Sequence, residues 1–149
     1  MALFARKPVS MVREARGKDL GLAWPLIAEH AAELGRPLLG NPDLLKRHFS
    51  AWKVCGLYVA LEGKQVVGYA VATRTYDVFR TLPGIHATHL WVSPAARDRG
   101  HERALLQFLA NQGQSHGYAH LLIHPDCVPG FLAQEIGAHP DPAGWKLEW

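Results

Sequence analysis

The residues best suited to chemistry lie in 90–106, LWVSPAARDRGHERALL, where a strand-like stretch, a basic loop and a helical pattern follow one another. The start of a helix offers free backbone N–H groups and the positive end of the helix dipole, and both favour phosphate. Gly100 allows the backbone to approach a ligand closely. Arg97, Arg99 and Arg103 add guanidinium groups that can bond phosphate oxygens in pairs. The segment predicts an anion site, or else a basic loop that caps an ordinary surface helix.

Several strands and helices must position this segment. Strand-like patterns cover 11–15, 57–61, 65–75, 85–92, 118–124 and 145–149. Helical patterns follow Gly17, start at Asn41-Pro42, and cover 97–112 and 128–136. This order predicts an α/β fold of the mixed α+β kind, with a central mixed sheet and helices on both faces.

Local signals predict where some of these elements begin and end. Asp19 is expected to cap the first helix, with Leu22, Ile27, Ala31 and Leu34 on its buried face. Glu62-Gly63-Lys64 is expected to form a tight hairpin turn. Pro83-Gly84 is expected to lie in the loop that leads to the strand at 85–92.

Composition narrows the class of protein. The 149 residues fit one domain, 1–149, with 48% apolar and 19% charged residues. No apolar run approaches the roughly 20 residues that a membrane span needs. The N-terminal MALFARKPVS lacks the apolar core of a secretion signal, so we expect a cytoplasmic protein with no membrane partner. A net charge of +3 without a Lys/Arg-rich run gives no reason to expect a nucleic-acid partner.

Cysteine and histidine do not predict a metal centre. The two cysteines, Cys55 and Cys127, form no C-x-x-C pair, so we expect reduced structural thiols. Among nine histidines, His120 and His124 share one face of a predicted strand and Asp126 follows nearby. Such groups are zinc ligands in principle, but no ligand motif joins them. We expect no bound metal.

The motif at 97–103 resembles the pyrophosphate loop of the GNAT superfamily of acyl-CoA-dependent N-acyltransferases, Arg/Gln-x-x-Gly-x-Gly/Ala. Arg97 and Gly100 match the loop, and Leu90-Trp91-Val92 matches the strand before it. The hairpin LYVALEGKQVVGYAVA is similar to the central strands of the family. Thr75-Tyr76-Asp77 and Gly144-Trp145-Lys146-Leu147 are also similar to the diamine (spermidine/spermine-type) acetyltransferase branch.

The resemblance implies transfer of acetyl from acetyl-CoA, as cosubstrate, to a primary amine of a small molecule or protein. It implies that the strand residues Leu90, Trp91 and Val92 hold the pantetheine arm. The expected pyrophosphate loop consists of Arg97, Asp98, Arg99, Gly100, His101, Glu102 and Arg103. Many members of this branch are dimers, so a homodimer is expected.

Three features, at four positions, depart from the family pattern. Glu102 occupies the small-residue position of the loop, where a carboxylate facing the anion site would repel it by ~3 kcal/mol at ~5 Å. Ala133 occupies the position of the family's tyrosine acid. Thr88 and His89 replace the paired carboxylates of the polyamine branch, so a classical polyamine is a less suitable acceptor. His89 is a candidate general base or a packed strand histidine.

Two interpretations remain open at this point. Tyr76 and Asp77 are candidate contacts for the acceptor amine, because this part of the family fold lines the acceptor pocket, or they form an ordinary turn. The whole chain is either an amine acetyltransferase or a catalytically impaired GNAT-fold protein that acts as a binding or interaction module. Glu102 and Ala133 favour the second.

Overall fold

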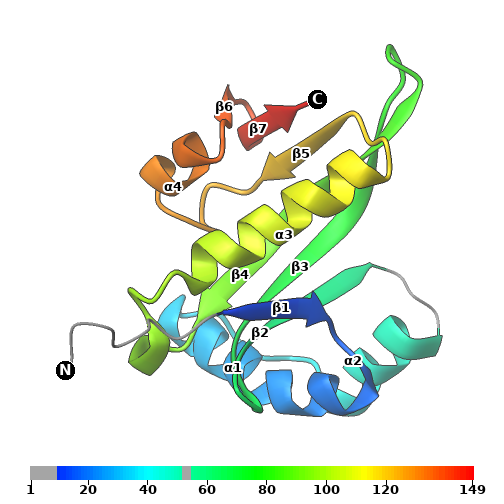
Figure 1. Cartoon of the computed structure of the whole chain (residues 1–149). Coiled ribbons are helices and arrows are strands. Elements are labelled where there is room, and N and C mark those ends of the chain that lie inside the picture. The colour runs from blue at the N-terminus through cyan, green and yellow to red at the C-terminus, as the bar shows by residue number, and fades with distance from the viewer. Residues whose placement is uncertain (1–9, 52–54) are drawn as a thin grey trace.

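A seven-stranded mixed sheet runs through the centre of the computed structural model, which describes residues 10–51 and 55–149 (Figure 1). The strands are β1 (Met11–Glu14), β2 (Gly56–Glu62), β3 (Gln65–Asp77), β4 (Leu82–Val92), β5 (His120–Ile123), β6 (His139–Asp141) and β7 (Gly144–Glu148). Their order in the sheet is β1-β2-β3-β4-β5-β7-β6. Among the strands of the described residues, only β4 and β5 pair in parallel. The mixed sheet expected from the sequence is confirmed.

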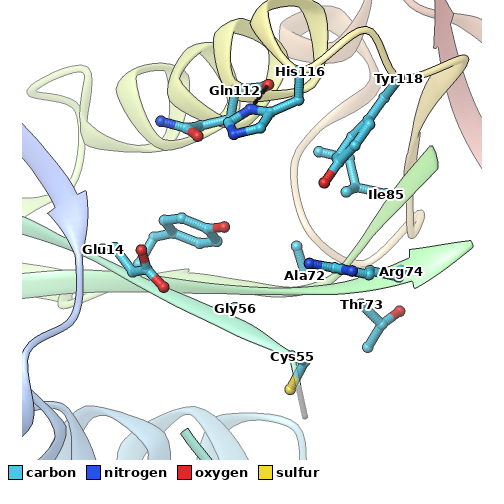
Figure 2. Close-up of a pocket in the computed structure, with 11 residues that line it drawn as sticks. Glu14, Cys55, Gly56, Ala72, Thr73, Arg74, Ile85, Gln112, His116 and Tyr118 are labelled. Atoms are coloured by element: carbon cyan, nitrogen blue, oxygen red, sulfur yellow. Dashed lines mark hydrogen bonds between the residues drawn. The ribbon is translucent and has the colours of Figure 1, made fainter. Parts of the chain in front are cut away.

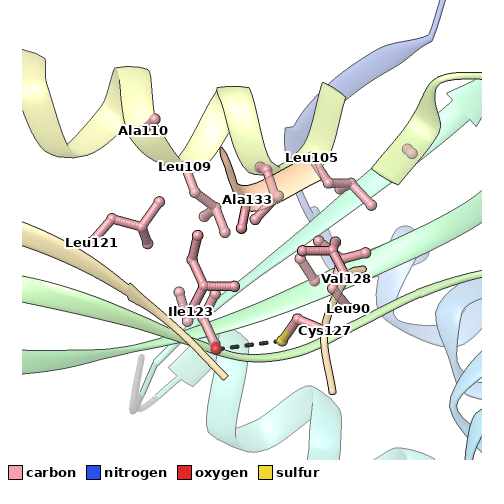
Figure 3. Packing of buried hydrophobic residues seen from close by; sticks show 14 of the residues in the cluster. Leu90, Leu105, Leu109, Ala110, Leu121, Ile123, Cys127, Val128 and Ala133 are labelled. Carbon is pink, nitrogen blue, oxygen red and sulfur yellow. Dashed lines mark hydrogen bonds between the residues drawn. The ribbon is translucent and has the colours of Figure 1, made fainter. Parts of the chain in front are cut away.

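Helices cover both faces of the sheet (Figure 1). The helices are α1 (Gly17–Glu33), α2 (Pro42–Lys46), α3 (His101–Ser115) and α4 (Gly130–Glu135). A π-helical turn, Arg47–Ala51, continues α2, and a 3-10 turn, Pro94–Ala96, follows β4. The α1 face packs Leu20 and Ala23 against Leu57 and Val59 of β2. On the α3 face the main core is formed by β4, β5, α3 and α4 (Figure 3), with Leu90, Leu105, Leu109, Ile123 and Ala133 among its members.

Local sequence signals predicted one helix start and one hairpin turn correctly. Asn41 caps α2, because its side-chain oxygen accepts the Leu44 N–H at 2.9 Å with Pro42 as the first helical residue. The hairpin between β2 and β3 turns at Gly63, where φ is +59°. Glycine adopts this left-handed conformation at little cost.

The first helix differs from expectation at both its start and its face. Arg16 is the N-cap, and Asp19, in the first turn, accepts the Arg16 N–H at 2.9 Å. Asp19 is fully buried and also binds Arg13 on β1, at 3.0 Å. Leu22 and Leu34, predicted to be buried, are exposed, whereas His30 is buried. The buried face of α1 was predicted wrongly because the prediction assumed that leucines are buried and that the histidine, as a polar residue, is exposed.

The bounds of α3 and β4 also differ from those predicted from the sequence. Residues 97–100 form a turn and not helix, since Asp98 and Gly100 have φ values of +63° and +85°, and α3 starts at His101. Pro83 and Gly84 lie inside β4, so the expected loop there is wrong. The chain turns instead at 78–81, before β4. The short strand β6 was not predicted.

Candidate functional site

The sheet opens between β4 and β5. The two strands pair from Ile85 to Ala87, and the carbonyl oxygen of Ala87 then accepts the His124 N–H at 2.9 Å. In a parallel ladder every second residue faces the same partner strand, so the next N–H toward β4 is that of Asp126, and it donates instead to the Nδ1 atom of His124 at 3.1 Å. The thiol of Cys127 donates to the same Ala87 oxygen at 3.4 Å, which closes the turn (Figure 3). From residue 88 to 92, β4 therefore has no strand partner on its β5 side in the described part of the chain.

A β-bulge lies where the strands separate. On the β3 side, Val71 pairs with His89 and Ala72 pairs with Ala87, so Thr88 is an extra residue in β4. Its hydroxyl donates to the Val71 carbonyl at 3.3 Å. Bulges turn side chains toward new directions and are frequent beside active sites. His89 is exposed here, with its Nδ1 atom 3.0 Å from the Thr88 hydroxyl oxygen.

A groove of about 470 Å³ follows the unpaired part of β4. It is lined by the expected pantetheine strand, the end of α1, the start of α3 and the 125–129 segment, with Trp91, Glu33, Glu102 and Val128 as representatives. A smaller cavity of about 150 Å³ adjoins it and contains His89, Arg36 and His124. His30, Leu90 and Cys127 line both, so the two cavities form one continuous site at the opening of the sheet.

The start of α3 faces this groove. The first N–H groups of a helix have no partner within the helix. Gly100 is the N-cap in a left-handed conformation, which an L side chain adopts only with strain. Binding of an anion at this helix start stays a prediction.

The arginines of the 97–103 segment are already paired with carboxylates. The partners and nitrogen–oxygen distances are Arg97 with Glu33 at 2.6 Å, Arg99 with Glu62 at 2.8 Å, and Arg103 with Glu135 at 3.2 Å. Glu102 lines the groove, and among the described residues its side chain forms no hydrogen bond or ion pair. Asp98 is exposed.

His101 lies elsewhere than the loop prediction suggests. Its side chain is fully buried, with Nε2 at 2.7 Å from Glu62 and Nδ1 at 2.7 Å from the Ser10 hydroxyl. The ring therefore anchors the start of α3 to the β2–β3 hairpin. Only the His101 backbone remains on the groove side as a candidate anion contact.

The imidazoles at the opening favour the neutral form. His89 is exposed, but neighbouring atoms remove part of the water around its ring, and this partial desolvation, followed by the charges of Arg36 and His124, lowers the pKa of His89. Burial and then His89 lower the pKa of His30, whose Nδ1 is 2.5 Å from the Tyr69 hydroxyl. Neutral imidazoles accept protons, as a general base must. His30 was missed from the sequence because it lies among helical apolar residues.

Two other potential reactive groups are not activated. Burial raises the pKa of the Cys127 thiol to about 12, so this cysteine is not a thiolate nucleophile at neutral pH. Ala133 is fully buried in α4, within the core (Figure 3). It supplies no hydroxyl at the position of the family's tyrosine.

Tyr76 and Asp77 are not brought to this site. They lie at the far end of β3, opposite Pro83 and Leu82, and line neither cavity. The Asp77 carboxylate accepts the N–H groups of Phe79 and Arg80 at 3.1 and 3.0 Å, which is the turn geometry considered above. Their contact with an acceptor amine stays a prediction.

The described residues contain no cluster of three or more His, Cys, Asp or Glu side chains placed to hold a metal ion. His120 instead bonds the Thr75 hydroxyl at 2.8 Å. Within 10–51 and 55–149, no helix has the length and apolar character that a membrane crossing requires.

Comparisons with known proteins agree with this architecture. The family model described as acetyltransferase (GNAT) family matches residues 26–129. A search of curated proteins gives no match. Solved structures with the same fold include a ribosomal-protein-alanine N-acetyltransferase from Brucella melitensis biovar Abortus 2308, at 19% identity and TM-score 0.74, covering 95% of this chain and 99% of that one.

Two further solved structures are similar. A predicted acetyltransferase with acetyl-CoA from Clostridium acetobutylicum shares 18% identity at TM-score 0.71, with 95% of this chain and 96% of that chain covered. An aminoglycoside acetyltransferase from an uncultured soil metagenomic sample, in complex with trehalose, shares 15% identity at TM-score 0.69, with 85% and 84% covered. At such identities the structures establish the fold alone, whereas the family model spans most of the chain. The chain belongs to the acetyltransferase (GNAT) family.

Proposed function

We propose that this acetyltransferase transfers the acetyl group of acetyl-CoA to a primary amine of a small molecule or protein at the opening between β4 and β5. The observation that carries the proposal is the unpaired edge of β4, residues 88–92, which is joined to the N-terminus of α3 by the turns at 93–100. An extended amide-containing arm can pair with such an edge as an added strand does. The pyrophosphate then reaches the backbone N–H groups at the start of α3.

His89 is the proposed base. It accepts a proton from the acceptor ammonium, and the amine nitrogen then attacks the thioester carbonyl carbon. A C–N bond forms as the C–S bond breaks, and the proton that the nitrogen loses on becoming an amide passes through water to the CoA thiolate, because Ala133 has no hydroxyl to supply one. The lowered pKa of His89 supports this role, since the imidazole is unprotonated at neutral pH.

The acceptor class remains open within this proposal. The similar structures include an enzyme whose name specifies ribosomal-protein alanine and one whose name specifies aminoglycosides. The similarity to the diamine branch is a third suggestion, and it stays a prediction. A homodimer also stays a prediction, which light scattering tests.

Calorimetric titration with acetyl-CoA, at low and at moderate salt, is the first experiment. Micromolar binding that weakens with salt supports a phosphate contact at the α3 start. Acetyl transfer is then measured against an alanine-first peptide, an aminoglycoside and spermidine. No binding up to about 1 mM contradicts the proposal. Binding without transfer to any amine favours the binding-module interpretation of Glu102 and Ala133.

A further inference from the structure

A second hollow, of about 390 Å³, lies on the α3 side of the sheet at the opposite end of that helix (Figure 2). Gln112 and His116, which line it, come from the last turn and C-cap of α3. The start of α3, beside the groove, is about 20 Å away at 1.5 Å per residue. The hollow shares no lining residue with the groove or with the adjoining cavity.

Small residues on the sheet create this hollow. Gly56 of β2 and Ala72 of β3 are cross-strand neighbours and form its floor. A Cβ atom on Gly56 would lie 2.6 Å from the hydroxyl oxygen of Tyr58, so only glycine leaves that space for the tyrosine. Since α3 ends at Ser115, no further helical turn fills the volume above them.

Opposite charges line the hollow without neutralising each other. Glu14, the last residue of β1, and Arg74 of β3 stand on opposite sides of it in Figure 2. Neither side chain has a hydrogen bond or ion pair with any described residue. By contrast, Arg97, Arg99 and Arg103 are each held by a glutamate. An ammonium and a carboxylate on one ligand would satisfy both groups.

Two phenols complete the wall. Tyr58 and Tyr118 are half-buried, and neither hydroxyl bonds to a described residue. Burial and then the Glu14 carboxylate raise the pKa of Tyr58, so its hydroxyl remains a neutral donor. Their rings offer flat apolar surface beside the charged groups. These features suit a small organic molecule better than a lone inorganic ion.

The strand register limits the length of such a ligand. Glu14 pairs with Tyr58 and Tyr58 pairs with Ala70, and Arg74 lies four residues farther along β3. At about 3.3 Å per residue and 4.8 Å per strand, the Cα atoms of Glu14 and Arg74 are about 16 Å apart. Both side chains are exposed and stand roughly perpendicular to the sheet, so a ligand that contacts both charged groups must be longer than a single α-amino acid. An extended dipeptide spans about 7 Å, whereas the two charges of a single α-amino acid are closer together.

We propose that this hollow binds a small zwitterion of dipeptide length, with its ammonium group on Glu14 and its carboxylate on Arg74. The proposal is separate from acetyl transfer, because none of these residues lines the groove. The guanidinium of Arg74 can bond a carboxylate through two parallel N–H groups.

Calorimetric titration with Ala-Ala and its capped forms tests the proposal. Ala-Ala carries both charges, N-acetyl-Ala-Ala only the negative one, and Ala-Ala amide only the positive one. We expect each cap to weaken binding at least tenfold. In Glu14→Gln the acetyl cap no longer matters, and in Arg74→Gln the amide cap no longer matters. Glu29→Gln and Lys46→Gln, at exposed positions outside the hollow, keep the wild-type pattern.

Cys55 reports occupancy of the hollow without reference to activity. It lines the hollow, whereas the other cysteine, Cys127, lies in the groove, and mass spectrometry locates the label. We expect Ala-Ala, but not acetyl-CoA, to slow alkylation of Cys55, and the effect to disappear in Glu14→Gln and Arg74→Gln. No binding of Ala-Ala up to about 10 mM overturns the proposal. The proposal is also overturned if the capped forms bind as tightly as Ala-Ala, or if bound Ala-Ala does not slow the alkylation of Cys55.

Discussion

The Nη2 atom of Arg97 lies 2.6 Å from the Oε2 atom of Glu33, so the first arginine of the loop is tied to the last residue of α1. The same carboxylate oxygen accepts the indole N–H of Trp91 at 3.0 Å, and the guanidinium lies over the Trp91 ring. A ligand phosphate that uses Arg97 must compete with Glu33. The pair is partly exposed, so its free energy lies in the range of about 0–1 kcal/mol.

We therefore expect Glu33→Gln to tighten acetyl-CoA binding by up to about fivefold. The amide keeps a hydrogen-bond acceptor for Trp91 but loses the charge that holds Arg97. Calorimetry at low salt measures the change, with Glu29→Gln on the same helix as the control. Weaker binding in Glu33→Gln would mean that Glu33 orients Arg97 for the ligand.

Glu102→Gln removes a carboxylate that lines the groove and has no partner within 10–51 and 55–149. Repulsion of ~3 kcal/mol between unit charges at ~5 Å corresponds to an affinity gain of up to about 100-fold, and we expect at least tenfold. The gain shrinks with added salt, because screening weakens the repulsion. Equal affinities of Glu102→Gln and the parent at low salt would show that the carboxylate turns away from bound acetyl-CoA.

His89→Gln should lower the rate of acetyl transfer by about 10²-fold or more, the usual contribution of a general base. Because partial desolvation and nearby charges lower the pKa of His89, the rate of the parent protein should fall with acid only below about 6.5. A profile of kcat/KM against pH measures this fall in rate at acid pH, and we expect the fall to be absent in the His89→Gln variant. His139→Gln, at an exposed position, is the control. An unchanged profile in His89→Gln assigns the base to another group.

Folding stability should fall as the pH decreases from 7.5 to 5. Desolvation is the main cause that lowers the pKa values of His30, His86, His89 and His120. Below about 6.5 the unfolded chain therefore binds more protons than the folded one, and stability is lost as the pH falls. The lowered pKa values of Asp19, Glu33 and Glu62 act only in more acidic solution, because their reference values are 3.8 and 4.5.

Urea unfolding at several pH values tests this expectation. His86→Gln should flatten the dependence, since it removes one contributing imidazole, and His139→Gln should not. Stability that is constant between pH 7.5 and 5 contradicts the inferred desolvation of the histidines.

Gly144→Ala should destabilise the fold by about 2–4 kcal/mol. Its φ is +129°, and an added Cβ would collide with the Ile123 carbonyl oxygen and the Pro125 ring. Gly21→Ala is the matched control, because nothing lies within 4 Å of its Cβ position in α1. That change should stabilise by about 0.5–1 kcal/mol. Denaturant unfolding compares the two, and equal effects would contradict the close approach of β7 to the end of β5.

The features that the sequence predicted correctly are those that depend on residues close together in the chain. The Asn41-Pro42 helix start, the turn at Gly63 and the order of strands and helices follow from local rules and from spacing. The helix expected from 97 begins only at His101, after a turn at 97–100. The pairing of the arginines was not predicted, because Glu33, Glu62 and Glu135 are far from them in sequence and meet them only through the fold.

Long-range contacts also explain the remaining differences. Asp19 caps the first helix as expected, but from its first turn and not from the N-cap position, and it also forms a buried pair with Arg13 on a neighbouring strand, which the sequence did not predict. His30 is buried because its ring contacts the Tyr69 hydroxyl and stacks on Trp91 of the sheet. The spacing of apolar residues along a helix does not predict such contacts. Asp77 was a candidate contact for the acceptor amine only by resemblance to the family. The hydrogen bond that its carboxylate accepts from the Phe79 N–H is that of the alternative interpretation, an ordinary turn.

The opening between β4 and β5 begins where one backbone N–H bonds to a side chain instead of to the next strand. In a parallel ladder, every second residue of a strand faces the same partner, so Asp126 follows His124 as the next donor toward β4. Its N–H donates to the Nδ1 atom of His124 at 3.1 Å, and the Cys127 thiol takes the last free place on the Ala87 carbonyl. The apex of the groove is therefore held by one imidazole and one thiol, so substitutions at these two positions, and not in the core, are the ones that change how far the two strands stay paired.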